Sequence, residues 1–265
     1  MKLLCPICGK ELEKVDKSCR CGGGHSFDIA RQGYVNLLTV QQKHSLNPGD
    51  TREQVLSRRS FLEAGYYAPI IEALIETAKE LSITGPILDV GCGEGYYSSR
   101  LADALNAQLL GLDISKEAVR CAAAKYKSHT WITATAAHIP VADGAAQLVT
   151  SLFALTLPEE FSRVLEEGGY YFQVLAAQDH LLGLKSIIYP ELKFKEKDSV
   201  PELPGFRLVR SQPIRFTFTV EGEQVQNLFS MTPHVFRICT EGAQNLRKTE
   251  ILTDTASCVL NIYQK

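Results

Sequence analysis

Residues 86–97, Pro-Ile-Leu-Asp-Val-Gly-Cys-Gly-Glu-Gly-Tyr-Tyr, decide the fold of this chain. Ile87 to Val90 form a short apolar run that predicts a buried strand, and three glycines then alternate at positions 91, 93 and 95. Helix-forming residues follow from Tyr97 to Leu105, with apolar side chains at helical spacing. A strand, a glycine turn and a helix open a nucleotide-type site in an α/β fold, because glycines let a ligand lie against main-chain N–H groups.

The glycine spacing favours S-adenosylmethionine over a dinucleotide. A dinucleotide fingerprint is G-x-G-x-x-G, whereas this loop is G-x-G-x-G with Tyr96 after the third glycine. The charges of Asp89 and Glu94 would repel a pyrophosphate but suit a sulfonium and an ammonium group. A second predicted strand, 107–114, contains Asp113, 22 residues after Gly91, where a carboxylate can accept both hydroxyls of a ribose. We therefore predict a cofactor site that contains Asp89, Gly91, Gly93, Glu94, Gly95 and Asp113. The alternative is a glycine-rich turn without a ligand.

Length and charge suit one α/β domain with a basic appendage. The chain has 265 residues, with 28 Lys and Arg against 30 Asp and Glu. Residues 1–59 hold 10 of the basic and 6 of the acidic side chains, which leaves 18 and 24 for residues 60–265. A basic N-terminal part on an acidic body would steer a polyanion to one face. A solvated surface with a chance asymmetry explains the same counts equally well.

Targeting signals and membrane spans are not evident in the sequence. No run reaches the roughly 18 apolar residues of a membrane span, and Met1 to Cys5 do not resemble a signal peptide. We therefore expect a cytoplasmic location and no membrane partner. Eight cysteines in such a protein favour metal binding or free thiols over disulfides.

The N-terminal segment has the spacing of a zinc site. Cys5 and Cys8 form a C-x2-C turn, and His25 follows a cysteine pair and three glycines. Cys19 and Cys21 compete for the third position, and we favour Cys21 because the glycine-rich link to His25 can wrap the metal. The rival interpretation, a redox C-x-x-C, expects a strand-then-helix setting that is absent here. One structural zinc would supply the folding energy of a segment too short for its own core.

The pattern Asp-x-Gly-x-Gly-x-Gly with a distal Asp resembles motif I and the following acidic residue of class I methyltransferases. This resemblance implies a Rossmann-like class I methyltransferase sheet, mostly parallel with its last strand antiparallel, beside the small N-terminal zinc-binding domain. We expect a zinc segment over 1–36, a linker and helices over 37–82, and a methyltransferase domain over 83–265. Helices are predicted over 51–64, 69–81 and 222–231, and further strands over 129–136, 147–153, 170–176, 206–220 and 257–263.

Strings spread over nearly the whole chain resemble the large-subunit ribosomal RNA guanine-N1 methyltransferases. Besides the zinc segment and the glycine loop, they are Gly33-Tyr34-Val35-Asn36-Leu37-Leu38, Pro48-Gly49-Asp50, Arg58-Arg59-x-Phe61-Leu62, Gly65-x-Tyr67, Leu184-Lys185-x-x-Ile188-Tyr189 and Met231-Thr232-Pro233. Within this pattern, Phe153-Ala154-Leu155 departs from the family, which usually has a proline at the third position.

The resemblance implies methyl transfer from S-adenosylmethionine to N1 of one guanine in a hairpin of 23S ribosomal RNA by a homodimer. It implies that Cys5, Cys8, Cys21 and His25 hold zinc and that Tyr67, Gly93, Glu94 and His180 contact the cofactor. His180 on its own would equally suit a surface residue. The same resemblance makes macrolide resistance a property to test.

We predict that Arg58, Arg59 and Phe153 contact the RNA. Tyr66 and Trp131 are, with Phe153, candidates for stacking on a base. We expect residues 87–180 to build the cofactor crevice, so that charge reversal at Arg58 and Arg59 leaves cofactor affinity nearly unchanged. The sequence does not single out the base that removes the N1 proton. The alternatives are a small-molecule methyltransferase, for example on a quinone precursor, and a non-catalytic interaction protein that binds cofactor and zinc.

Overall fold

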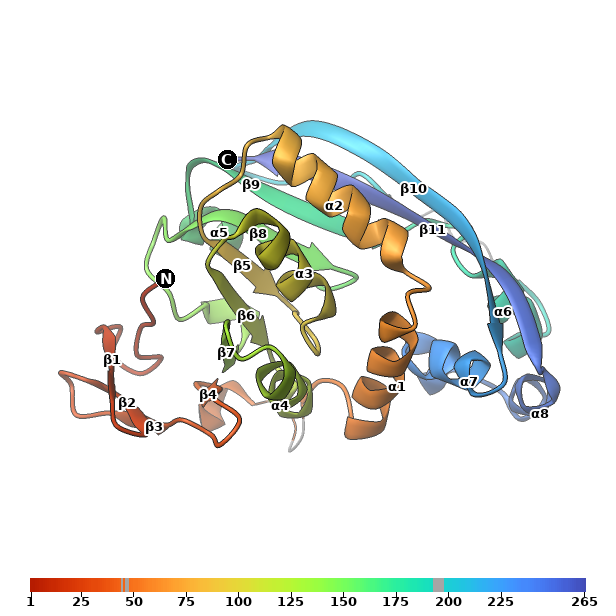
Figure 1. The fold of residues 1–265 in the computed structure, drawn as a ribbon, viewed down its shortest axis with the longest axis horizontal. Helices are drawn as coiled ribbons and strands as arrows, with labels where there is room; N and C mark the ends of the chain where they lie inside the picture. Colours follow the sequence, from red (N-terminus) through yellow and green to blue (C-terminus); the bar gives the residue numbers. More distant parts are fainter. Residues whose placement is uncertain (44, 46–47, 193–197) are drawn as a thin grey trace.

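An eight-stranded sheet forms the centre of the computed structural model, which describes residues 1–43, 45, 48–192 and 198–265 (Figure 1). The strand order is β10-β11-β9-β8-β5-β6-β7-β4. The strands are β4 (Val35–Asn36), β5 (Ile87–Val90), β6 (Leu109–Asp113), β7 (Thr130–Thr133), β8 (Ala146–Leu152), β9 (Leu165–Ala176), β10 (Arg207–Glu221) and β11 (Ile251–Gln264). Neighbours from β9 to β4 pair in parallel, and β11 is antiparallel to both β9 and β10. The predicted fold, with its antiparallel last strand, is therefore confirmed.

Helices cover both faces of the sheet and gather at one end of the long β10–β11 hairpin (Figure 1). They are α1 (Arg52–Glu63), α2 (Ala68–Glu80), α3 (Tyr96–Leu105), α4 (Lys116–Lys125), α5 (Pro158–Val164), α6 (Leu182–Ile188), α7 (Glu223–Ser230) and α8 (Thr240–Lys248), with the 3₁₀ turns η1 (Val40–Gln42), η2 (Ala136–His138) and η3 (Pro233–Phe236). At that end of the hairpin α7 packs against α1. In the part of the chain that the structure describes, no helix has the length and apolar character needed to cross a membrane.

The first predicted helix begins where its capping residues place it. The Thr51 hydroxyl accepts a hydrogen bond from the Gln54 N–H, and the Gln54 side chain accepts one from the Thr51 N–H. This reciprocal capping box satisfies two donors that a helix N-terminus leaves unpaired. It fixes the entry of α1, which carries two of the predicted site residues.

The N-terminal segment is built into the sheet rather than tethered to it. Its hairpin strands β1 (Leu12–Val15), β2 (Ser18–Cys21) and β3 (Ser26–Asp28) form a separate small sheet. The same segment supplies β4, which pairs in parallel with β7, and the Leu4 N–H donates to the Pro140 carbonyl at 2.8 Å. Leu12 and Leu37 belong to the same buried apolar cluster as strand residues of β5 and β6. The hydrophobic effect therefore holds this segment against one face of the sheet.

Trp131 packs against the glycine loop from within the core. Its side chain is 1% exposed, and its indole N–H donates to the Tyr126 carbonyl at 2.8 Å. A Cβ on Gly95 would lie 2.6 Å from the indole ring, and one on Gly111 would lie 2.3 Å from it. Gly95 thus makes room for the ring as well as turning the chain. The prediction that Trp131 could stack on an RNA base is wrong, because the ring is enclosed in the core.

Candidate active site and zinc site

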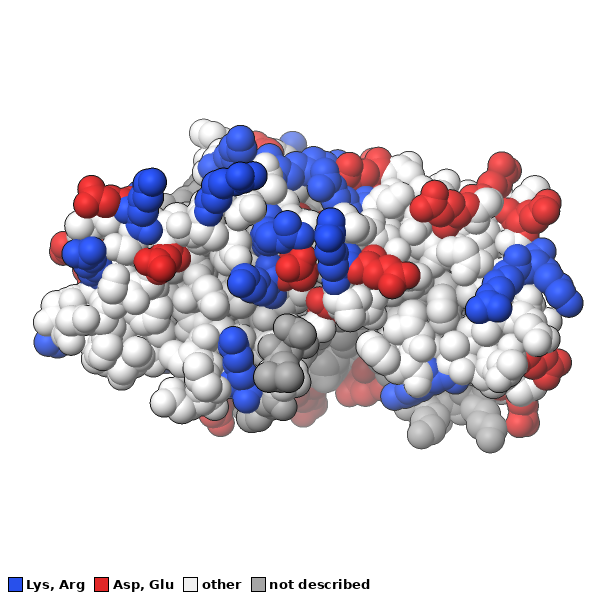
Figure 2. Space-filling model, turned by 90° about the horizontal axis from the view of Figure 1, so that it is seen from below, with Lys and Arg blue, Asp and Glu red and all other residues white. Residues whose placement is uncertain are grey.

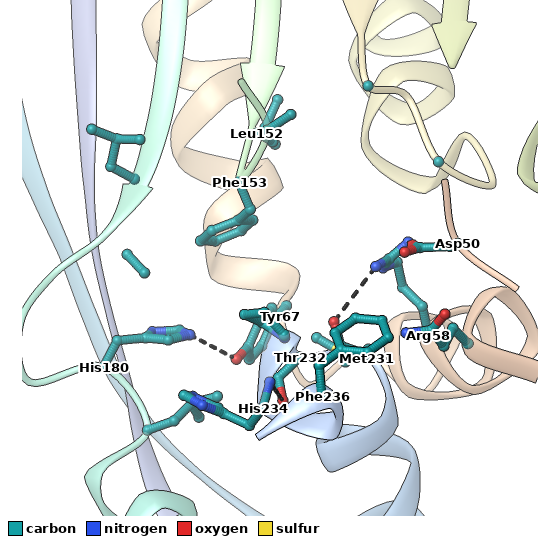
Figure 3. Close-up of a pocket in the computed structure, with 18 of the residues that line it drawn as sticks. Asp50, Arg58, Tyr67, Leu152, Phe153, His180, Met231, Thr232, His234 and Phe236 are labelled. Carbon is teal, nitrogen blue, oxygen red and sulfur yellow. Dashed lines mark hydrogen bonds and ion pairs between the residues drawn. The ribbon is translucent and has the colours of Figure 1, made fainter. Parts of the chain in front are cut away.

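A cavity of about 1290 Å³ opens at the carboxyl ends of the central parallel strands. Its walls combine the glycine loop, residues of α1, the loop after β8, the chain that runs into α6, and residues 231–237. Figure 3 shows Phe153 at the end of β8, Tyr67 near the middle with His180 on its left, Arg58 and Asp50 on its right, and the labelled residues between Met231 and Phe236 below the middle. The expectation that residues 87–180 alone build the crevice is wrong, because α1 and η3 close it.

Asp113 fixes the glycine loop. Its Oδ2 accepts a hydrogen bond from the Gly93 N–H at 2.8 Å, and its Oδ1 accepts one from the Ser115 N–H at 2.8 Å. Gly91, Gly93 and Gly95 all have positive φ angles, of 81°, 56° and 83°, which favour glycine. The structure thus brings together, at the end of β5, the three glycines and the acid that the sequence singled out.

Asp89 lies behind the loop, at the end of its strand. The side chain is 3% exposed, and the Thr150 hydroxyl donates to its Oδ1 at 2.6 Å. Burial raises the pKa of Asp89 to about 6, against the lowering effect of that hydrogen bond. The carboxylate is therefore held in place by a neighbouring strand and still borders the cavity.

Glu94 and Tyr97 are the groups that best fit a bound cofactor. Glu94 is 5% exposed, and its Oε2 and the Tyr97 hydroxyl are buried without a hydrogen-bond partner among the described residues. Burial raises the pKa of Glu94 to about 7, although the charge of Arg58 opposes the rise. Because buried polar groups are rarely left unpaired, these atoms fit a site whose partner is a cationic ligand such as S-adenosylmethionine.

Tyr67 and His180 lie together in the cavity although they are 113 residues apart in sequence. The Tyr67 hydroxyl is 3.4 Å from His180 Nε2, and His180 Nδ1 accepts a hydrogen bond from the Ser257 N–H at 3.1 Å. Tyr67 is 2% exposed, whereas Tyr66 packs on the rings of Phe61 and Phe218. Of these two neighbouring tyrosines, Tyr67 lines the cavity.

Arg58 faces the cavity, and Arg59 faces away. Arg58 forms an ion pair with Asp50, its Nη2 donates to the Met231 carbonyl at 3.5 Å, and its side chain is 25% exposed. Arg59 pairs with Glu63 on the outer surface of α1 at 2.8 Å. The position of Arg58 weighs against the expectation that charge reversal there leaves cofactor affinity nearly unchanged. A reversed charge at this position would lie beside Glu94 and would disturb the cofactor side of the cavity.

Phe153 presents an aromatic ring to the cavity from a strained turn. Its φ angle is 54°, a region that L-residues other than glycine seldom adopt, and the residue is 42% exposed. Its ring centre lies 6.0 Å from that of His180, and its N–H donates to the Val174 carbonyl at 2.9 Å. Such strain persists where the surrounding structure imposes it, often at functional sites.

The four predicted metal ligands meet in the N-terminal segment. The ligating atoms of Cys5, Cys8, Cys21 and His25 all lie within 4.8 Å of one another. His25 Nδ1 is 3.5 Å from the sulfurs of Cys5 and Cys21, and the sulfurs of Cys8 and Cys21 are 3.6 Å apart. A tetrahedral zinc ion would separate sulfur from nitrogen by about 3.6 Å and sulfur from sulfur by about 3.8 Å. The donor set therefore fits one structural zinc, while Cys19 packs into the apolar cluster outside the four.

The sheet order, the glycine loop and the acid at the end of β6 define a class I methyltransferase. Residues 87–169 match the family model described as "Methyltransferase domain", and residues 3–46 match the zinc-ribbon model described as "RlmA, N-terminal". The fold is similar to that of a Haemonchus contortus phosphoethanolamine N-methyltransferase 2 in complex with S-adenosyl-L-methionine. That match has a TM-score of 0.52 at 13% identity and covers 81% of this chain and 57% of the other.

Two curated relatives narrow the class to one family. A 23S rRNA (guanine(748)-N(1))-methyltransferase of Streptomyces fradiae is 35% identical over 87% of this chain and 84% of its own length. A Bacillus subtilis (strain 168) protein, named as a candidate 23S rRNA (guanine-N(1)-)-methyltransferase, is 30% identical over 86% of this chain and 85% of its own. The chain belongs to the 23S ribosomal RNA guanine-N1 methyltransferase family.

Three parts of the site had no assigned role in the sequence analysis. They are Asp50, which pairs with Arg58, the unpartnered Tyr97 hydroxyl, and η3 with the residues before it. Asp50 and Met231 lie in two of the strings that carry the family resemblance, and nothing else in the sequence indicated that they belong to the site. Their contacts depend on segments far apart in the chain, which periodicity and spacing cannot bring together.

Separate serine substitutions of Cys19 and Cys21 test which of them is the third cysteine ligand of the zinc ion. We expect Cys21→Ser to lose the zinc ion, because a thiolate ligand disappears, and Cys19→Ser to keep one zinc per chain. Elemental analysis of freshly purified, chelator-free protein measures both. Zinc retained by Cys21→Ser and lost by Cys19→Ser would exchange the two assignments.

Glu94 should make cofactor binding pH-dependent. A cation favours the ionised carboxylate, whose pKa is about 7 before binding, so affinity for S-adenosylmethionine should rise with pH. Between about pH 6 and 8 we expect an increase of about tenfold, because the ionised fraction rises by that factor. Calorimetry at several pH values measures it. Glu94→Gln should flatten this dependence, whereas Glu80→Gln, at a surface pair with Arg210, should preserve it. A flat dependence in the wild type would contradict the role of Glu94.

Proposed function

We propose that this chain transfers a methyl group from S-adenosylmethionine to N1 of a guanine in a hairpin of 23S ribosomal RNA. The observation that carries the proposal is a cavity with the glycine loop and Glu94, whose Oε2 has no hydrogen-bond partner among the described residues, on one side and the strained, half-exposed Phe153 on the other. The cavity has room for a cofactor and for a base brought in from outside. Membership of the guanine-N1 family supplies the substrate class.

The cofactor supplies an electrophilic methyl group on a sulfonium, and this chain's residues hold and orient it. Gly91, Gly93 and Gly95 offer main-chain contacts, and Asp113 accepts the ribose hydroxyls with the lone pairs that its backbone bonds leave. Asp89 and Glu94 place negative charge near the sulfonium and the ammonium group, and Tyr67 and His180 close the same end of the cavity. Alignment of the nucleophile with the methyl group within about 3–3.5 Å is then the main catalytic contribution.

RNA docking is assigned to the outer surface beside the cavity. Arg59 lies on that side of α1 and Phe153 at the cavity mouth, whereas Arg58 acts through Asp50 and the loop that bears it. Figure 2 shows Lys and Arg side chains on the end of this face that carries the N-terminal segment and across its middle, with acidic side chains between them. Phosphate contacts by such side chains position an RNA, and an aromatic ring can stack on an unpaired base.

The two alternatives each leave part of the chain without a use. A small-molecule methyltransferase would not need the zinc segment that is built into the sheet through β4. A non-catalytic binding protein would not need a strained aromatic residue beside the cofactor loop. The homodimer, the cytoplasmic location, the boundaries of the domains and macrolide resistance remain predictions.

Stacking by Phe153 gives a direct test of the base-binding side. Phe153→Leu keeps an apolar side chain but removes the aromatic face, so methylation of a hairpin transcript should fall about tenfold or more, since a stacked base contributes about 1–3 kcal/mol. Phe153→Tyr should retain activity. Mass spectrometry quantifies N1-methylguanine in the transcript, and calorimetry measures the affinity for S-adenosylhomocysteine separately.

The control is Leu208→Ala, a residue of β10 with a similar exposed fraction, 43%, which should change neither quantity. Cofactor affinity should be unchanged in every variant. Full activity of Phe153→Leu, or a parallel loss of cofactor binding, would contradict the assigned role of this ring.

A further inference from the structure

A methyl group can be added to guanine N1 only if the N1 proton leaves, because the nitrogen lone pair is otherwise delocalised into the ring. A side chain in the cavity must therefore accept that proton or pass it to water. Among the residues that the structure describes, His180 and His234 are the histidines that line the cavity. The hydrogen bonds of the two rings distinguish their roles, and the argument below rests on the proposed function.

His180 is held as a proton donor. Its Nδ1 accepts from the Ser257 N–H at 3.1 Å, and a backbone N–H can only donate. The neutral ring therefore carries its proton on Nε2, the atom that faces the Tyr67 hydroxyl at 3.4 Å. Neither ring nitrogen of His180 can take a further proton without losing the bond to Ser257.

His234 has the opposite arrangement. Its Nδ1 lies 2.8 Å from the Tyr189 hydroxyl, and a hydroxyl can accept as well as donate. Tyr189 can therefore accept from an Nδ1–H and leave Nε2, which has no hydrogen-bond partner in the described ranges, as a proton acceptor. When Nε2 takes a proton, the bond to Tyr189 is kept. The ring is half-buried, so it is accessible to a base in the cavity.

The position of His234 is fixed relative to the cofactor loop. It lies in η3, three residues after Met231, whose carbonyl accepts from Arg58 at 3.5 Å. The same guanidinium lies 3.8 Å from where a Cβ on Gly93 would be. Arg58 thus bonds to the chain just before η3 and lies close to the glycine loop, and Figure 3 shows His234, Phe236 and Arg58 on adjoining parts of the cavity wall.

We propose that His234 is the general base of the reaction and that Tyr189 is a positioning residue that orients its ring. The N1–CH₃ bond forms as the S–CH₃ bond breaks, and the electron pair of the broken bond stays on sulfur. The N1 proton moves to Nε2 of His234, so the products are N1-methylguanine, S-adenosylhomocysteine and an imidazolium. The imidazolium then loses its proton to water, and Tyr189 accepts from Nδ1–H throughout.

The surroundings keep His234 neutral before the reaction. Burial lowers the pKa of His234, and the positive charges of Lys185 and Arg237 lower it further. Among the described residues, the Tyr189 hydroxyl contacts the ring, and His180 and Glu191 are titratable groups that line the same cavity. An imidazole with a pKa below its ordinary value of 6.5 is unprotonated at neutral pH and returns its proton readily.

The test compares His234→Asn with the wild type on a hairpin transcript. We expect kcat to fall about 100-fold or more, the usual share of a general base, with affinities for S-adenosylhomocysteine and hairpin RNA unchanged. In the wild type, kcat/KM should rise with pH to a plateau with an apparent pKa below 6.5. The variant should lack this limb and keep rising at alkaline pH, as guanine itself loses its proton. Added imidazole should restore part of the rate to His234→Gly.

Two further variants and an NMR titration separate the role of His234 as the base from that of Tyr189 as a positioning residue. Tyr189→Phe should lower kcat and keep the acid limb, and His129→Asn, whose ring pairs with Asp103 outside the cavity, should change neither. An NMR resonance absent from His234→Asn should titrate below pH 6.5. Unchanged kcat and pH profile in His234→Asn, or a loss confined to RNA affinity, would overturn the assignment while leaving the proposed function intact. Wild-type protein that forms no N1-methylguanine would overturn both.

Discussion

The hydrogen bond from the Gly93 N–H to the Asp113 carboxylate is the contact on which the site depends. It joins the turn after β5 to the end of β6, and the second oxygen of Asp113 receives the Ser115 N–H. The Ser115 hydroxyl donates to the Asp50 carbonyl at 2.8 Å, and the Asp50 side chain pairs with Arg58. A continuous set of polar contacts thus runs from the centre of the sheet to α1 and, through Met231, to η3. Because these groups are largely buried, loss of one partner would leave the others unpaired at a high cost in free energy.

Three acids give the cavity its chemical character, of which Asp89 and Glu94 are buried and Asp113 is half-buried. Burial raises the pKa of Asp89 to about 6, that of Glu94 to about 7 and that of Asp113 above its ordinary value. The guanidinium of Arg58, which lies beside Glu94, offsets part of this charge. Such a site is incomplete without a cation, and a sulfonium ligand meets that need without a metal ion. The acids therefore favour a cationic cofactor, and in the proposed reaction Phe153 and His234 act on the incoming base.

The sequence predicts the parts of this molecule that rest on local pattern. Strand and helix periodicity, the G-x-G-x-G loop and the C-x2-C spacing locate the sheet, the cofactor turn and the four clustered ligands. It fails where a long-range contact decides the direction of a side chain. Arg58 and Arg59 are adjacent and chemically identical. Arg58 faces the cavity because it contacts Asp50 and Met231, whereas Arg59 pairs with Glu63 on the outer surface. Trp131 is a residue type that often stacks on bases, but its ring is buried against Gly95 and Gly111. His234 is a candidate base only because the fold places η3 near the glycine loop.

The most direct test of the account is to map methylation in 23S ribosomal RNA from cells that contain the protein and from cells that lack its gene. N1-methylation blocks Watson–Crick pairing, so reverse transcription stops at the modified guanine, and mass spectrometry of the fragment identifies the product. The account predicts one guanine, in a hairpin, that carries N1-methyl only when the protein is present and that regains it with the wild-type gene but not with a variant that cannot bind the cofactor. Identical methylation in both RNAs, or a modification at another atom, would contradict it.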